Sequence, residues 1–165
     1  MEYRRALQGE CERVYQLVQE TITAVYPRYY PEEVVEFFLC LHGRENIQRD
    51  LDARRLWVLF EEDELVGTGS LRKDHITRVF VHPRFQGKGY GSFILQSLED
   101  EAAKEYQKVQ LEASLPAEGL YEKRGYTTAE ICRWEQKSGA VLFYKRMEKQ
   151  VKTKVLVESL TPSPW

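Results

Sequence analysis

The sequence contains little cysteine, and this shortage excludes two kinds of structure. Of its 165 residues, only Cys11, Cys40 and Cys132 are cysteines. Their number is odd, their spacing is wide, and no Cys-x-x-Cys or mixed Cys/His pattern surrounds them. We therefore expect reduced thiols, with neither a disulfide framework nor a metal site.

An excess of positive charge and a long apolar run are also lacking. The formal net charge is −2 at pH 7 and no tract is rich in lysine and arginine, so we do not expect nucleic acid as a partner. No apolar run approaches the roughly 18 residues that a membrane span needs. The first residues also lack the apolar segment of a signal peptide. We therefore expect a cytoplasmic protein that has no membrane partner.

The chain length fits one folded domain. We assign residues 1–149 to this domain and residues 150–165 to a C-terminal tail, because the composition shifts after Lys149. Residues 151–157 alternate in polarity like an edge strand, whereas residues 161–164 predict irregular structure. The tail is therefore either irregular or an added edge strand, and such a strand would pair with a second copy in a homodimer.

Hydrophobic periodicity predicts the element order β-α-α-β-β-β-α-β-α-β-β. Helical spacing predicts helices over residues 10–25, 31–41, 89–106 and 117–124, with a further helical piece at 44–51. Apolar stretches predict strands at residues 3–7, 55–61, 64–71, 75–81, 109–113, 127–134 and 140–148. Consecutive hairpins and one strand-helix-strand crossover predict an α/β fold, with a mixed, mostly antiparallel central sheet flanked by helices.

The strongest local pattern lies where the strand ending at Val81 leads into a helix. Three glycines stand at this junction: Gly87, Gly89 and Gly91. Glycines let backbone N–H groups approach a ligand, and a helix N-terminus favours an anion such as phosphate. Full positive charges are expected nearby from Lys88, Arg84 and Arg124.

Two known phosphate-binding motifs do not fit this junction. A P-loop needs Lys-Ser or Lys-Thr after its glycines, and neither dipeptide follows here. A Rossmann fingerprint needs a third glycine where Ser92 stands, and the hairpins before the junction do not suit a Rossmann half. A Rossmann-like nucleotide-binding domain therefore remains only a weak alternative.

Two segments resemble motifs of the GCN5-related N-acetyltransferase (GNAT) superfamily. Residues 86–91, Q-G-K-G-Y-G, resemble its Q/R-x-x-G-x-G/A motif, and residues 117–126, A-E-G-L-Y-E-K-R-G-Y, resemble its A-x-x-L-Y-x-x-x-G-F/Y segment. The resemblance covers roughly residues 57–145. It implies the GNAT acyl-CoA N-acyltransferase fold, acetyl-CoA as the acetyl donor, an amine as the acceptor, and no metal.

The resemblance also implies which residues hold the cofactor. Backbone groups of the glycine turn would cradle the pyrophosphate, and the preceding strand would bind the pantetheine arm. The implied cofactor-binding residues are Val79, Phe80, Val81, Gln86, Gly87, Lys88, Gly89, Tyr90, Gly91 and Ser92. Ser114 joins them because it stands where many members have an asparagine, although a hydroxyl offers fewer hydrogen bonds than a carboxamide.

The implied reaction is direct attack of a neutral primary amine, from a small molecule or a peptide, on the thioester in a ternary complex. Tyr121, the tyrosine of the second motif, is the candidate acid for the leaving thiolate, because a phenol with a pKa of about 10 stays protonated at pH 7. The backbone amide of Val79 is expected to stabilise the oxyanion.

His75, six residues before Val81, is the candidate base, and Glu112 is the alternative. Strict alternation along the strand predicts that His75, Thr77, Val79 and Val81 share one face of the sheet.

Three tyrosines stand between the first two predicted helices, a segment that covers the acceptor site in the GNAT superfamily. Tyr26, Tyr29 and Tyr30 are therefore the candidate substrate-binding residues, because aromatic rings with polar tips can frame an amine. The alternative is that they only fill the core. For the whole protein, the alternative to an enzyme is an acyl-CoA sensor or regulatory domain without turnover.

Overall fold

The computed structural model describes residues 1–151, which build one sheet of seven strands. The strands are β1 (Glu2–Arg5), β2 (Leu56–Glu61), β3 (Glu64–Arg72), β4 (His75–Val81), β5 (Lys108–Ala113), β6 (Thr127–Glu135) and β7 (Val141–Gln150). The α-helices are α1 (Cys11–Val25), α2 (Glu32–Leu41), α3 (Arg44–Asp52), α4 (Tyr90–Ala102) and α5 (Glu118–Lys123). Short 3-10 turns cover Tyr26–Arg28, Pro83–Phe85 and Leu115–Ala117.

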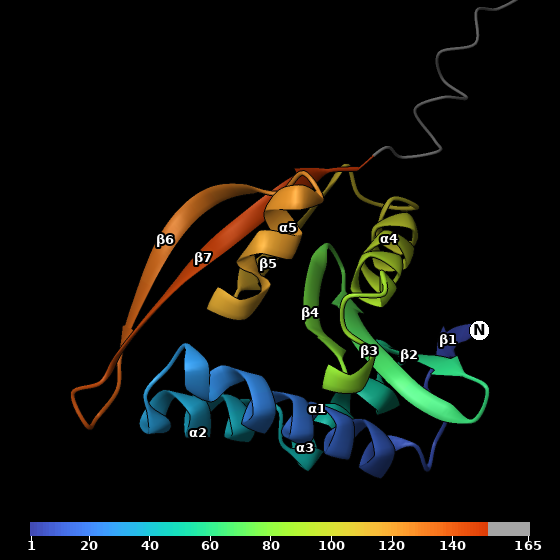
Figure 1. Cartoon of the computed structure of the whole chain (residues 1–165). Helices are drawn as coiled ribbons and strands as arrows, with labels where there is room; N and C mark the ends of the chain where they lie inside the picture. The colour runs from blue at the N-terminus through green and yellow to red at the C-terminus, as the bar shows by residue number, and fades with distance from the viewer. Residues whose placement is uncertain (152–165) are drawn as a thin grey trace, which may run out of the picture.

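The sheet order is β1-β2-β3-β4-β5-β7-β6, and all neighbouring strands are antiparallel except β4 and β5 (Figure 1). The predicted fold class is therefore confirmed. Helix α4 connects the two parallel strands, because parallel neighbours need a crossover.

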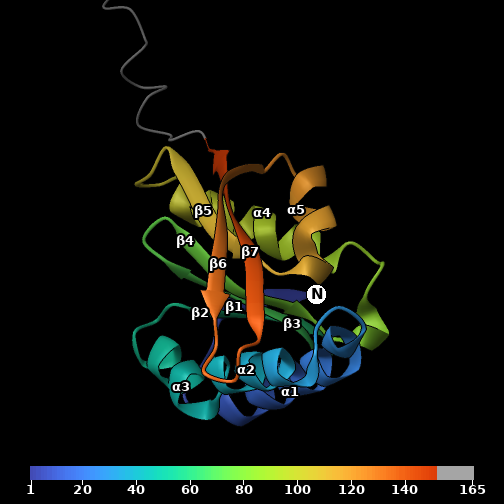
Figure 2. The ribbon, with the colours of Figure 1, turned by 90° about the vertical axis from the view of Figure 1, so that its left-hand side faces the viewer.

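Helices cover both faces of the sheet, with α1, α2 and α3 below it and α4 above it in Figures 1 and 2. The apolar run of β2 is continuous because both faces of this strand are covered. Leu56, Val58 and Phe60 pack in the core with α1–α3, whereas Trp57 and Leu59 pack in the core with α4. A strand covered on both faces needs apolar residues at every position.

Two glycines of β3 bring α4 close to the sheet. A Cβ atom at Gly67 would lie 2.6 Å from Ile94 Cδ1, and one at Gly69 would lie 2.8 Å from Leu98 Cδ1. No larger side chain fits under the helix at these positions without a shift. This packing holds the first turn of α4 next to the end of β4, where the glycine turn lies.

Most predicted boundaries differ from the structure by one or two residues, and the largest difference is at the end of α4. Helix α4 ends at Ala102, not at residue 106, because the chain turns there: Lys104 N–H donates to Glu101 O at 3.3 Å and Glu105 N–H to Ala102 O at 3.1 Å, bonds that span three residues instead of four. Strand β7 runs to Gln150, and Val151 N–H donates to Gln107 O at 2.7 Å. The predicted tail beyond Val151 lies outside the described residues, so its edge strand and the homodimer stay predictions.

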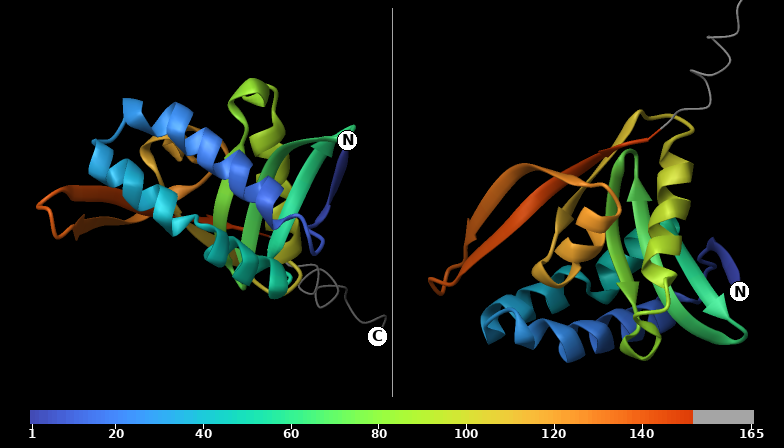
Figure 3. Two further views of the ribbon diagram at one scale, coloured as in Figure 1. Left: turned by 90° about the horizontal axis from the view of Figure 1, so that it is seen from below. Right: turned by 45° about the horizontal axis from the view of Figure 1, so that its top comes forward.

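The parallel strands β4 and β5 separate after their first contact. Their register contains one pair, His75 with Gln110, although β4 continues to Val81. Figure 3 shows the two strands spreading apart beyond that point. Within residues 1–151, the edge of β4 that faces β5 is thus without a strand partner over most of its length, which leaves backbone groups free for a ligand.

A β-bulge in β4 makes the predicted alternation wrong. Thr68 pairs with Phe80 and Ser70 pairs with Thr77, so a single residue of β3 lies opposite two residues of β4. As a result Ile76 packs in the same core as Val79 and Val81. His75 and Thr77, the neighbours of Ile76, are therefore directed to the opposite face, the one covered by α1–α3.

Candidate active site

A cavity of about 900 Å³ occupies the opening between β4 and β5. This volume is typical of sites for small ligands and cofactors. One end, here called the glycine end, is lined by Gly87, Gly89, Gly91, Ser92, Leu120 and Lys123. The other end, here called the arginine end, is lined by His42, Arg49, Asp50, Arg55, Arg72 and Arg78. Val79, Tyr26, Ser114 and Tyr121 line the middle.

The glycine end has the geometry of an anion site. Gly87 has φ +79° and Gly89, the N-cap residue of α4, has φ +88°, conformations that favour glycine. A Cβ atom at either position would meet no atom of the described residues within 4 Å, so the backbone there borders open space. Gln86 donates from Nε2 to Val81 O at 2.9 Å and closes the turn. The free N–H groups of α4 and its dipole favour a phosphate there.

The charged residues expected near this turn lie differently. The Lys88 ammonium lies 5.6 Å from the centre of the Phe85 ring, and Lys88 is not among the residues that line the cavity. Arg124 does not line the cavity either, because it binds the buried carboxylate of Glu99 at 3.1 Å. The backbone, rather than these side chains, therefore dominates the glycine end.

Tyr121 lies in the middle of the cavity on α5 and is 6% exposed. Its ring packs edge-on against Tyr126, with centroids 5.6 Å apart. Burial, and to a lesser degree the nearby Tyr26 phenol, raises the pKa of Tyr121 above its usual value. The phenol is therefore a proton donor at neutral pH. The edge of β4 from Val79 to Val81 lines the same part of the cavity.

The three candidate substrate tyrosines occupy different environments. Tyr26 lines the cavity and donates from its hydroxyl to Ser114 Oγ at 3.3 Å, and burial raises its pKa to about 12. Tyr30 is buried outside the cavity lining, where its hydroxyl accepts from Leu115 N–H at 2.7 Å. Tyr29 is 48% exposed and lies outside the lining as well. The structure thus brings Tyr26 and Ser114 together at the cavity wall.

The two candidate bases, His75 and Glu112, lie next to each other at the start of β4, where this strand pairs with β5. His75 Nε2 forms a hydrogen bond with Glu112 Oε2, and both residues line the cavity. Neither residue is fully buried, since the side chains are 33% and 42% exposed. A carboxylate beside an imidazole orients the ring, and both groups carry lone pairs. The pair is therefore suited to accept a proton.

Arg78 anchors the arginine end. Its side chain is only 7% exposed, and its backbone lies at φ +52° in the bulge of β4. Nη1 donates to His42 Nδ1 at 2.7 Å and Nη2 donates to Asp50 Oδ2 at 2.9 Å. Asp50 also pairs with Arg55 at 3.3 Å. Burial and the adjacent Arg78 lower the pKa of His42 to about 3, so this ring stays neutral.

Sequence reasoning missed the arginine end almost completely. Its residues come from the end of α2, from α3, and from strands β3 and β4, and no local pattern links these segments. Arg78 alone offered a signal, because a charged residue in an apolar strand needs a partner or a ligand.

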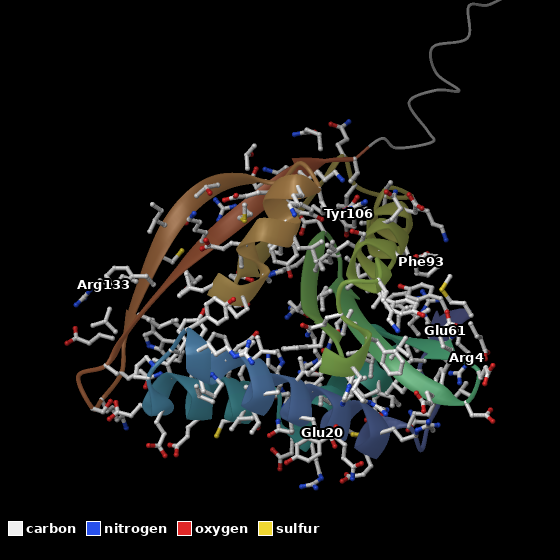
Figure 4. The ribbon with its side chains drawn as sticks, in the orientation of Figure 1. Arg4, Glu20, Glu61, Phe93, Tyr106 and Arg133 are labelled. Carbon is white, nitrogen blue, oxygen red and sulfur yellow. The ribbon has the colours of Figure 1, made fainter. Side chains whose placement is uncertain are left out.

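Among residues 1–151, no three His, Cys, Asp or Glu side chains gather as a metal ion would require. In the same part of the chain, every helix is too short or too polar to cross a membrane. Figure 4 shows Arg133 on β6 at the outer edge of the molecule, and neither Arg133 nor Tyr106, which follows α4, lines the cavity.

The family model described as an acetyltransferase (GNAT) domain matches residues 25–151. The chain belongs to this family. The match includes both motifs that suggested the resemblance, and it also includes the helices of the arginine end. No curated protein matches the sequence.

Solved GNAT structures share the fold at low sequence identity. A GCN5-related N-acetyltransferase from Rhodopseudomonas palustris is 23% identical, with a TM-score of 0.82 over 91% of this chain and 95% of that one. The PaiA N-acetyltransferase of Thermoplasma acidophilum, in complex with coenzyme A, is 18% identical, with a TM-score of 0.68 over 90% and 98%. The putative acetyltransferase YncA of Salmonella typhimurium, with acetyl-CoA, is 17% identical, with a TM-score of 0.65 over 100% and 99%.

Proposed function

We propose that this GNAT protein transfers the acetyl group of acetyl-CoA to a primary amine of a small molecule or peptide. One observation carries the proposal. A single cavity runs from the glycine turn, past Tyr121, to the His75–Glu112 pair through the opening between β4 and β5. Direct transfer needs the donor and the acceptor in one such cavity at the same time.

In this proposal acetyl-CoA occupies the glycine end. The N–H groups around Gly87 and Gly89 and the N-terminus of α4 bind the pyrophosphate. The unpaired edge of β4, residues 79–81, forms backbone hydrogen bonds with the pantetheine arm, much as an added strand would. The backbone N–H of Val79 is the proposed donor to the thioester carbonyl oxygen.

The acceptor enters from the other face. Because of the bulge, His75 is directed to the face covered by α1–α3, while Val79 and Val81 pack on the α4 face. The gap between β4 and β5 connects the two faces. The His75–Glu112 pair takes a proton from the acceptor ammonium, directly or through water, and Tyr26 and Ser114 line the path of the amine.

The reaction then balances without a further reactant. The amine nitrogen attacks the acetyl carbon, a C–N bond forms and the C–S bond breaks. The His75–Glu112 pair passes the ammonium proton on to solvent. Tyr121 gives its phenolic proton to the departing sulfur, and the second proton of the nitrogen, carried through water, restores the phenol. The products are the N-acetylated amine and free CoA. Its raised pKa keeps Tyr121 protonated until the thiolate forms.

Thermal unfolding with acetyl-CoA, and with NAD and ATP as controls, tests the cofactor. A ligand at about a hundred times its dissociation constant adds roughly 2.7 kcal/mol. In a protein of this size that corresponds to about 5–10 °C. No shift with millimolar acetyl-CoA would overturn the proposal, and a shift with NAD instead would favour the nucleotide-binding alternative.

CoA release in the presence of amines then tests turnover. Stabilisation by acetyl-CoA together with CoA release for at least one amine supports the enzyme. Stabilisation without release for any amine favours the sensor.

A further inference from the structure

The arginine end carries a local excess of positive charge. Four arginines line it, and they come from α3, the segment before β2, the end of β3 and the bulge of β4: Arg49, Arg55, Arg72 and Arg78. The carboxylates that line the cavity are Asp50 and Glu112. The whole chain, by contrast, has a formal net charge of −2.

Both carboxylates already have partners inside the protein. Asp50 pairs with Arg78 at 2.9 Å and with Arg55 at 3.3 Å, and Glu112 binds His75. Arg49 donates to Asn46 Oδ1 at 3.1 Å and, like Arg72, forms no ion pair within residues 1–151. The wall therefore presents guanidinium groups whose charge the described residues do not balance.

The histidine at this wall also offers a donor. A guanidinium group can only donate, so the contact from Arg78 makes Nδ1 of His42 the acceptor and puts the ring proton on Nε2. The lowered pKa of His42 keeps the ring in this neutral form. In Arg78 itself, the buried Nε has no partner among the described residues. The wall is thus rich in N–H donors and poor in acceptors.

Arg72 lies too far from the glycine turn to serve the same phosphate. Arg72 pairs with His75, the first residue of β4, whereas the glycine turn follows Val81 at the other end of that strand. Seven extended residues span about 20 Å. The arginine end therefore belongs to the part of the cavity that the acceptor would occupy.

We propose that the acceptor amine also carries an anionic group, a carboxylate or a phosphate, which binds to Arg49, Arg72 and Arg78. This inference rests on the proposed acetyl transfer and adds the class of acceptor. Arginine binds both oxyanions through charge-assisted hydrogen bonds. The same wall repels a polyamine, whose charges are all positive.

Matched acceptors test the charge preference. The rate of CoA release is measured with each standard amino acid against its amide, and with O-phosphoethanolamine against ethanolamine; putrescine and spermidine serve as cationic acceptors. We expect an anionic member to exceed its neutral partner roughly tenfold in kcat/KM. A preference in the amino-acid pairs identifies a carboxylate, and a preference in the other pair identifies a phosphate. Highest activity with a neutral amine or a polyamine, or no anionic preference, would overturn the inference.

Arginine variants test the assigned residues. Arg72→Gln and Arg49→Gln remove exposed side chains without a described ion pair, so folding should be unaffected. Arg133→Gln on the β6–β7 hairpin is the surface control, since Arg133 lies outside the cavity and its 3.5 Å ion pair with Glu135 is exposed and therefore weak. We expect each cavity variant to raise KM for the anionic acceptor several-fold or more, while KM for the matched neutral acceptor stays unchanged. The dependence of KM for the anionic acceptor on salt concentration should also become weaker. Equal kinetics in all three variants would contradict the assignment.

A failure of the proposed function has a different signature. In that case acetyl-CoA does not raise the unfolding temperature and no amine releases CoA, which would overturn the acceptor class together with the activity. Stabilisation by acetyl-CoA without an anionic preference would overturn the acceptor class alone.

Discussion

Arg78 has a left-handed backbone conformation that residues with a Cβ atom rarely adopt. Such a conformation costs about 1–3 kcal/mol and persists where the surroundings hold it in place. The β3–β4 bulge and the bonds to His42 and Asp50 provide that hold. The strained backbone at Arg78 thereby directs its guanidinium group toward α2 and α3. It also reverses which face of the sheet the following side chains of β4 occupy.

His42 should make the protein less stable as the pH falls below 7. Its pKa is about 3 in the folded protein and about 6.5 in the unfolded chain. Between these values only the unfolded chain binds the proton, so stability that is fully present above pH 6.5 is lost as the pH falls. The loss is about 2 kcal/mol between pH 7 and pH 5. Urea unfolding at the two pH values measures it.

His42→Asn is the control for this prediction, because it keeps an acceptor for Arg78 and removes the titrating ring. We expect its pH dependence between pH 7 and pH 5 to be smaller than that of the wild type by about 2 kcal/mol. The same pH dependence in both proteins would mean that His42 titrates alike in the folded and unfolded states.

Tyr121→Phe should lower kcat by about a hundredfold, because the departing thiolate loses its proton donor. Acetyl-CoA affinity should change little, since the ring remains in place. Steady-state kinetics with the best acceptor and isothermal titration with acetyl-CoA measure the two effects. Tyr106→Phe removes a phenol outside the cavity and is the control. If both variants keep the wild-type kcat, Tyr121 is a packing residue only.

At the scale of elements, helix α4 is positioned by glycines at two places. Gly67 and Gly69 let it lie close on β3, and Gly89 begins it at the cavity with φ +88°. The first feature sets the distance between helix and sheet. The second directs the free N–H groups of the helix toward the space that the cofactor would fill.

Gly89→Ala should weaken acetyl-CoA binding at least tenfold, because a methyl group would enter the space proposed for the pyrophosphate. The variant should also lose about 1 kcal/mol of stability from the positive φ. Gly9→Ala is a matched control: Gly9 has φ +94°, its Cβ would also meet nothing within 4 Å, and it lies outside the cavity. Both variants should unfold at similar temperatures while only Gly89→Ala binds acetyl-CoA less tightly. Equal affinities would argue against a cofactor at this turn.

At the scale of the whole molecule, the sheet consists of two parts joined at a narrow seam. The register between β4 and β5 has one residue pair, supported by a hydrogen bond from Gln110 N–H to Asp74 O at 2.9 Å. The cavity lies in the gap that this seam leaves open. A ligand there would contact both parts and add contacts that the sheet itself lacks.

Acetyl-CoA should therefore slow amide hydrogen exchange on both sides of the gap. We expect protection in residues 79–81 of β4, at the start of α4 and in α5, with little change in β1 and β2. Exchange followed by mass spectrometry, with and without acetyl-CoA, measures this. Protection confined to β1 and β2, or none at all, would contradict binding in the gap.

Local patterns predicted most of the fold, because periodicity and turn residues act over short stretches. The apolar run from Leu56 to Phe60 predicted a strand, and the structure confirms it as β2 and shows that both of its faces are covered. The predicted end of α4 at residue 106 was wrong. Tyr106 continues the apolar stripe of the helix in the sequence, but the chain turns after Ala102. The bulge at Arg78 was missed because it depends on the register with β3.

The sequence by itself determined the family, the strands and helices, and the two motifs that contain the glycine turn and Tyr121, because each depends on residues that are near one another in the chain. Only the tertiary structure decided that Tyr26 meets Ser114, that His75 meets Glu112, and that Arg78 meets His42 and Asp50. Each of these contacts joins segments from different elements. Their positions depend on how the helices pack on the sheet and on where β4 and β5 part, which no short stretch of sequence encodes.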